Sequence, residues 1–133
     1  MSKLLQRLRD AKRSGVYRAP DTNAIDAATA GSGLDVVLID AARKPLEKIA
    51  GALSFPTWFG GNWDALEDSL GDLSWRSGDG HVLVFTAYPE ERELLMDVLR
   101  SSAQYWAARG KPFFAVFIDP QRKLGLPDLY REA

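Results

Sequence analysis

Residues 55–70 read Phe-Pro-Thr-Trp-Phe-Gly-Gly-Asn-Trp-Asp-Ala-Leu-Glu-Asp-Ser-Leu, and they predict a loop that leads into an amphipathic helix. Asn62 is a good N-cap, because its side-chain oxygen can accept a hydrogen bond from a free N–H group of the first turn. An apolar stripe suited to a core follows, formed by Trp63, Leu66, Leu70 and Leu73. We therefore expect a loop from Ser54 to Gly61 and a helix that ends at about Leu73.

The other face of this helix is acidic. Asp64, Asp68 and Asp72 recur at i, i+4 and i+8, Glu67 lies beside them, and no Lys or Arg occurs from Ile49 to Trp75. Like charges at i,i+4 destabilise a helix by about 0.2–0.5 kcal/mol per pair. A face that repels itself indicates a basic partner or a bound cation. A solvated acidic surface without a partner would show the same pattern.

Two large aromatic residues precede the helix. Trp58 and Phe59 stand next to Gly60 and Gly61 in the expected loop. Contact residues of binding proteins are often found in such loops, and aromatic residues are frequent among them. We expect one of the two rings to turn inward against the core and the other to stay available for a partner.

The run Phe-Pro-x-Trp-Phe-Gly-x-Asn-x-Asp-Ala-Leu-x-Asp-x-Leu, from Phe55 to Leu70, resembles the signature of the barstar family, and the order of elements is similar from about Leu34 to Asp119. That family consists of small intracellular inhibitors of secreted bacterial ribonucleases. The resemblance implies that the loop and helix face the enzyme, and that Asp68 enters its active site in place of a substrate phosphate. The candidate partner-binding residues are Trp58, Phe59, Gly60, Asn62, Trp63, Asp64, Glu67 and Asp68.

The chain also departs from the family pattern. Gly61 and Glu67 stand where the best-known member has an acid and a tryptophan. That member contributes a further glutamate from its last helix, a few residues before a glycine, whereas here the stretch from Gln104 to Arg109 contains no acid. One anionic contact of the family is therefore missing.

The rest of the chain alternates between helical and strand patterns. Apolar runs predict strands at Gly15–Arg18, Asp35–Ile39, Val82–Thr86 and Phe113–Ile118, with Val36 to Ile39 all buried. Helices are expected at 3–13, from Asp21 to about Gly31, from Pro45 to Leu53, and from Pro89 to Gly110. This alternation predicts an α/β fold in which helices pack on a mostly parallel sheet. The sheet would be barstar-like with three strands, to which residues 15–18 could add a fourth.

Length and composition fit one globular domain. We expect residues 1–133 to form it, with a core at about 34–119 and an N-terminal βα extension at about 1–33. The net charge of −1 hides an asymmetry, because residues 1–18 contain six basic side chains and one acid. The chain has no cysteine and no apolar run near the roughly 20 residues that span a bilayer. We expect a cytoplasmic monomer that binds no membrane.

The residues favour binding over catalysis. His81 is the single histidine, which excludes a pair of histidines as acid and base, and it is expected at the surface. Asp64 and Asp68 could serve a hydrolase or ligate Mg²⁺, but the neighbouring tryptophans suit a protein contact better, so we expect no cofactor and no metal. Acids interleaved with the aromatics would repel nucleic acid. The leading hypothesis is an inhibitor of a basic, barnase-like ribonuclease; the alternatives are a regulatory module for another basic protein and a carboxylate or metal-dependent hydrolase.

Overall fold

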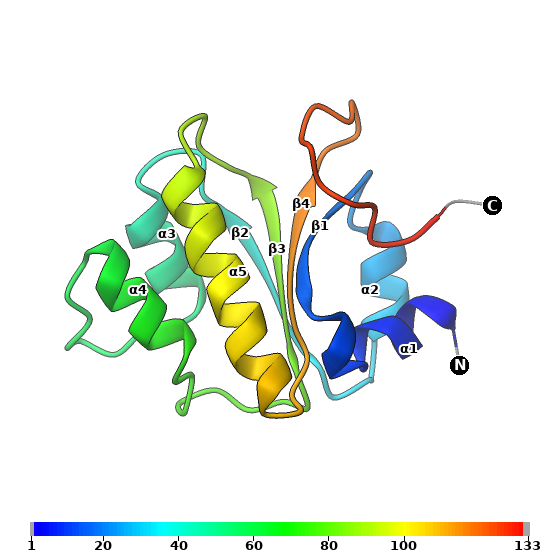
Figure 1. Ribbon diagram of the computed structural model, residues 1–133, viewed down its shortest axis with the longest axis horizontal. Helices are drawn as coiled ribbons and strands as arrows, with labels where there is room; N and C mark the ends of the chain where they lie inside the picture. The colour runs from blue at the N-terminus through cyan, green and yellow to red at the C-terminus, as the bar shows by residue number, and fades with distance from the viewer. Residues whose placement is uncertain (1, 132–133) are drawn as a thin grey trace.

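The computed structural model describes residues 2–131, which contain one sheet of four parallel strands between two layers of helices (Figure 1). The strands are β1 (Gly15–Ala19), β2 (Asp35–Asp40), β3 (His81–Ala87) and β4 (Phe113–Ile118), in the spatial order β1-β4-β3-β2. Every neighbouring pair is parallel. The predicted α/β fold is therefore confirmed, and residues 15–19 do supply a fourth strand.

The two central strands are buried on both faces, so the sheet separates two apolar cores. On β3, Leu83 and Phe85 point to one core, while Val82 and Val84 point to the other. The first core is covered by α3 (Pro45–Ala52), α4 (Trp63–Leu70) and α5 (Glu93–Ala108). The second is covered by α1 (Lys3–Leu8) and α2 (Asn23–Thr29), which lie on the opposite side in Figure 1.

The edge position of β2 changes its burial. Val37 and Ile39 are buried in the core beneath the α3–α5 layer, but Leu38 is 52% exposed and Val36 is half-buried. The expectation that all four residues would be buried was therefore wrong. An edge strand has a neighbour on one side only, and the exposure of Leu38 shows that the second layer of helices does not cover all of its face.

Several helix boundaries differ from the predicted ones. The N-terminal helix ends at Leu8, because the Asp10 side chain accepts from the Lys12 N–H and starts a separate 3₁₀ turn, η1 (Ala11–Arg13). Helix α5 begins at Glu93 rather than at Pro89. It ends before Gly110, whose φ of +74° suits the expected glycine stop.

The C-terminal segment packs back onto β1. Leu124, Leu126 and Leu129 are buried, and the Arg18 backbone exchanges hydrogen bonds with Pro127 and Leu129. In the part of the chain that the structure describes, no helix has the length and apolar character needed to cross a bilayer.

Candidate protein-binding surface

Helix α4 begins where the sequence predicts it. Asn62 has an extended backbone, with φ of −129°, and its side-chain oxygen accepts from the Ala65 N–H at 2.7 Å. This bond satisfies one of the donors that the first turn leaves unpaired. Leu66 and Leu70 are fully buried, so the apolar stripe points into the core as expected. The opposite face of α4 is thereby turned to solvent.

The C-terminal end of α4 comes earlier than expected. The helix stops at Leu70 with Gly71 as its C-cap, and Leu73 takes a left-handed backbone with φ of +50°. That turn lets Leu73 stay in the core at 2% exposure although it lies outside the helix. Asp72 therefore follows the helix and does not continue the face formed by Asp64 and Asp68.

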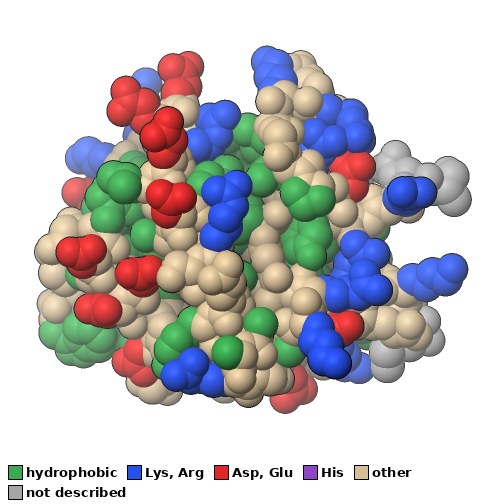
Figure 2. Space-filling model, viewed as in Figure 1, with side chains coloured by type: hydrophobic (Ala, Val, Ile, Leu, Met, Phe, Trp, Pro, Cys, Tyr) green, Lys and Arg blue, Asp and Glu red, His purple; other side chains and the backbone are tan. Residues whose placement is uncertain are grey.

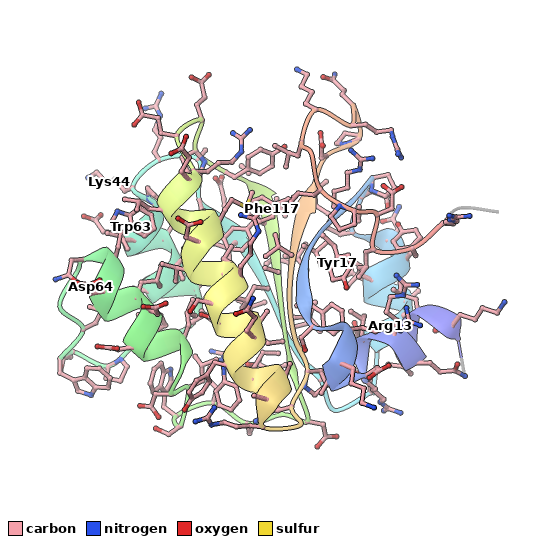
Figure 3. The ribbon with its side chains drawn as sticks, viewed as in Figure 1. Arg13, Tyr17, Lys44, Trp63, Asp64 and Phe117 are labelled. Atoms are coloured by element: carbon pink, nitrogen blue, oxygen red, sulfur yellow. The ribbon has the colours of Figure 1, made fainter. Side chains whose placement is uncertain are left out.

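The solvent-facing carboxylates of α4 are unpaired. Asp64, Glu67 and Asp68 are exposed, and within residues 2–131 none of them has a basic partner in an ion pair. Acidic side chains gather over α4 and α5 toward the left of the view in Figure 2, whereas Lys and Arg side chains are frequent at its right. Figure 3 places Trp63 and Asp64 together at the start of the helix. The acidic surface thus lies at one end of a polarised molecule.

The two aromatic side chains of the loop before α4 point in different directions, one toward the core and one toward solvent, as predicted. Phe59 is partly buried and packs on the core, with its ring 4.9 Å from that of Phe55. Trp58 is 62% exposed and leans edge-on against Trp75 at 6.0 Å. Trp75 also packs edge-on against Phe55 at 5.6 Å. Trp58 is therefore an exposed aromatic side chain that the ring of Trp75 supports from beneath.

The glycine pair lets the loop turn close to the helix. Gly61 has a φ of +72°, a left-handed conformation that L side chains rarely adopt. A Cβ on Gly60 would lie 3.4 Å from the Cβ of Ala65, the first-turn residue that Asn62 caps. The loop backbone therefore lies directly against the start of α4.

Helix α5 provides a neighbouring wall that the sequence did not reveal. Tyr105 is 39% exposed and borders a groove of about 440 Å³ together with Glu67, Asp68 and Gly71. The guanidinium of Arg109 lies 3.5 Å from the Tyr105 ring centroid, a cation–π contact. The i,i+4 spacing of this pair was a signal for their contact, but nothing in the sequence placed them beside α4.

A partly buried polar network is centred on Arg76, next to the Trp75 ring that contacts the aromatic loop. The Arg76 guanidinium forms two bonds to the Asp35 carboxylate, at 2.7 and 2.8 Å, and a third to the Leu53 carbonyl at 3.2 Å. Trp75 donates to the same carbonyl at 2.9 Å. The network therefore joins the start of β2 to the end of α3 and fixes the position of Trp75, which contacts Trp58.

His81 completes this network and corrects a prediction. It is fully buried rather than exposed, with Nδ1 2.9 Å from an Asp35 oxygen and its ring beside Trp106. Its Nε2 is buried without a hydrogen-bond partner among the described residues. Sequence reasoning missed this site because a residue next to a glycine-rich turn is usually exposed. Here the neighbouring β2 and α5 cover it.

The pKa values of this network follow from its geometry. Burial alone would raise the pKa of Asp35, but hydrogen bonds from Arg76 and His81 outweigh it and hold this pKa below 3.8. Burial lowers the pKa of His81 below 6.5, and the bond to Asp35 only partly opposes that effect. The neutral imidazole is thus the form that the fold favours, consistent with a buried Nε2 that has no acceptor among the described residues.

Residues 2–131 contain no cluster of three or more His, Cys, Asp or Glu side chains able to hold a metal ion. Within that range, Asp64, Glu67 and Asp68 therefore do not form a group that could hold a metal ion. Their surroundings are the exposed Trp58 loop on one side and the Tyr105 wall on the other, an arrangement with the features of a protein contact.

Comparison with known families identifies the family of this chain. The family described as Barstar (barnase inhibitor) matches residues 34–118, more than half of the chain. The chain therefore belongs to the barstar family, which is a family of inhibitors and not of enzymes, and whose members bind ribonucleases. The match contains β2, α3, α4, β3, α5 and β4, and residues 1–33 lie outside it. Neither a search of curated proteins nor one of solved structures finds a match.

Proposed function

We propose that this protein inhibits a barnase-type ribonuclease by covering its active site with α4 and the loop before it. The observation that carries the proposal is the exposed, unpaired acidic face of α4 beside the exposed Trp58, on the segment that resembles the family signature. The partner-binding residues would be Trp58, Phe59, Gly60, Asn62, Trp63, Asp64, Glu67 and Asp68. Residues 1–33 would extend the same domain.

The proposed mechanism is competitive occlusion. A ribonuclease active site must hold phosphate, so it is basic, and an acidic helix complements its charge and accelerates encounter. The Asp68 carboxylate would accept charge-assisted hydrogen bonds from the enzyme's basic side chains. Trp58 would cover the mouth of the site. Phe59 and Gly60 would contribute indirectly, because they fix the position of the Trp58 loop against the core and the start of α4.

The test compares inhibition and stability for Asp68→Ala, with barnase as the enzyme. Asp68 is exposed and has no ion-pair partner within residues 2–131, so its loss should leave stability unchanged or raise it by about 0.2–0.5 kcal/mol through reduced repulsion from Asp64. Inhibition should weaken at least 100-fold, because removing one member of a desolvated charge pair costs about 3–5 kcal/mol.

The control is Asp79→Ala, which removes an exposed carboxylate in the turn before β3. It should inhibit barnase as the parent protein does. If the parent protein does not inhibit barnase at micromolar concentration, or if Asp68→Ala inhibits equally well, the proposed function is wrong.

A further inference from the structure

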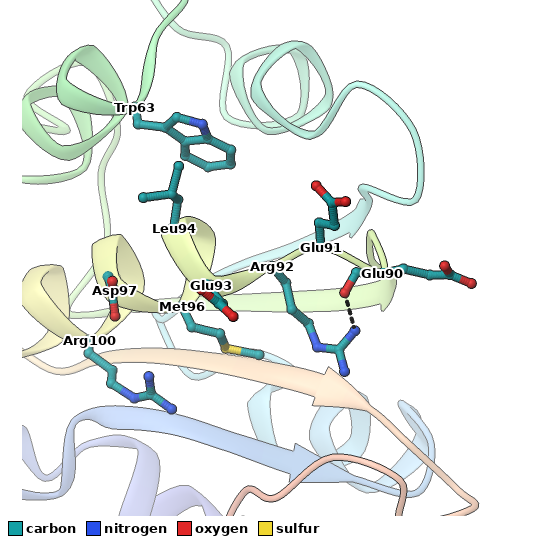
Figure 4. A pocket seen from close by; sticks show the side chains of 9 residues that line it. All are labelled: Trp63, Glu90, Glu91, Arg92, Glu93, Leu94, Met96, Asp97 and Arg100. Carbon is teal, nitrogen blue, oxygen red and sulfur yellow. Dashed lines mark hydrogen bonds between the residues drawn. The ribbon is translucent and has the colours of Figure 1, made fainter.

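Exposed apolar side chains gather around the proposed binding face. Four large hydrophobic residues are exposed within residues 2–131: Leu38, Trp58, Leu94 and Tyr105. Trp58 precedes α4, and Tyr105 borders α4 from the neighbouring helix. Leu94, in the first turn of α5, is 56% exposed, and its side chain points toward the Trp63 ring across the gap between α5 and α4 (Figure 4). Neither the family signature nor the sequence pattern assigns Leu94 a role.

Leu94 and Trp63 belong to a groove of about 1000 Å³ between the start of α4 and the start of α5. Met96, which is 8% exposed, adds a third apolar side chain to its lining. Trp63 is only partly buried, so part of its ring remains available in the groove. The groove therefore exposes apolar surface where its two helices begin, at Leu94 and Trp63, while Met96 on the other side of α5 belongs to the core.

The rim of this groove is acidic. Glu91, Glu93 and Asp97 are exposed, and none has an ion-pair partner within residues 2–131. Of the two basic side chains in the lining, Arg92 is turned back to its own loop, where it donates to the Pro89 and Glu90 carbonyls at 3.2 and 3.0 Å (Figure 4). The other, Arg100, forms no ion pair with these carboxylates in the described part of the chain, and the lining carries four carboxylates against two guanidinium groups.

The helix dipole explains only part of this pattern. It favours an acid such as Glu93 in the first turn of α5. It gives no reason for an exposed leucine among the carboxylates. Exposed apolar side chains beside a surplus of carboxylates are typical of a contact with a partner of the opposite charge.

We propose that the Trp63–Leu94 groove is a second contact surface for the same basic partner, an inference that rests on the proposed function. It would take an apolar side chain of the ribonuclease, flanked by Lys or Arg residues that meet Glu91, Glu93 and Asp97. Continuity argues for one partner, because Trp63 lines the groove and directly precedes Asp64 on α4. This second contact would compensate in part for the anionic contact that is missing on α5 near Gly110.

The experiment measures barnase binding kinetics for Leu94→Ser and for Asp97→Lys. Leu94→Ser should raise the dissociation rate and weaken binding roughly 5- to 10-fold, because a half-exposed leucine would lose its burial in the complex. Asp97→Lys should lower the association rate several-fold at low salt, and this loss should fade at high salt. Both residues are exposed, so both variants should melt as the parent does.

The matched control is Leu38→Ser. Leu38 is 52% exposed, lies on β2 and points away from the core beneath α3, α4 and α5, so binding should not change. If Asp68→Ala weakens binding but Leu94→Ser and Asp97→Lys bind like the parent, this inference is refuted and the proposed function stands. If the parent itself does not bind barnase, both are refuted.

Discussion

Replacing Arg76 by methionine should destabilise the fold strongly, although part of the Arg76 side chain is accessible to solvent. Methionine keeps much of the aliphatic length of arginine but removes all three hydrogen bonds that Arg76 donates to Asp35 and Leu53. Asp35 would keep its contact with His81. The Leu53 carbonyl would keep its bond from Trp75.

The magnitude follows from burial. Breaking a fully buried ion pair by removing one partner costs about 3–5 kcal/mol. The side chains of Arg76 and Asp35 are 21% and 10% exposed, so water replaces part of what is lost. We therefore expect a loss of about 2–4 kcal/mol in the free energy of unfolding. For a domain of this size that corresponds to a fall in Tm of roughly 10 °C.

The assay is thermal and urea unfolding of the variant beside Arg13→Met. Arg13 pairs with Asp10 at 3.6 Å, with side chains 55% and 44% exposed, and such pairs contribute about 0–1 kcal/mol. Arg13→Met should therefore unfold almost like the parent. If Arg76→Met also unfolds like the parent, this network does not stabilise the start of the sheet or the position of Trp75, and the reasoning is wrong.

Two further predictions concern single residues. Because the pKa of His81 is lowered in the folded state, the unfolded chain binds more protons near pH 6. The free energy of unfolding should therefore fall as the pH drops through about 6.5. NMR titration of this single imidazole should give a midpoint below 6.5, and a midpoint above 6.5 would contradict the lowered pKa. Asn62→Ala removes the bond to the Ala65 N–H and should cost about 1 kcal/mol in chemical denaturation, whereas an unchanged midpoint would show that this cap is not needed.

The sequence predicted the start of the candidate site better than its end. Asn62 as N-cap and Leu66 and Leu70 as buried positions follow from the spacing of residues within the helix, and the structure confirms them. The sequence also predicted that one of Phe59 and Trp58 would turn inward, but not which one, because that depends on the core and on the distant Trp75. The end of α4 depends on how Leu73 reaches the core through a left-handed turn. That geometry is set by packing, so the pattern of residues overestimated the length of the helix.

Sequence patterns were thus sufficient to predict the alternation of strands and helices, the acidic face with its aromatic loop, and the resemblance to the barstar family. They could not predict which distant residues meet. Arg76 pairs with Asp35 across 41 residues, and Leu94 reaches Trp63 from another helix. Local spacing describes the faces of one element, because side chains a few residues apart share a turn. Contacts between elements depend on how the sheet orders its strands and on which helices then share a side of it.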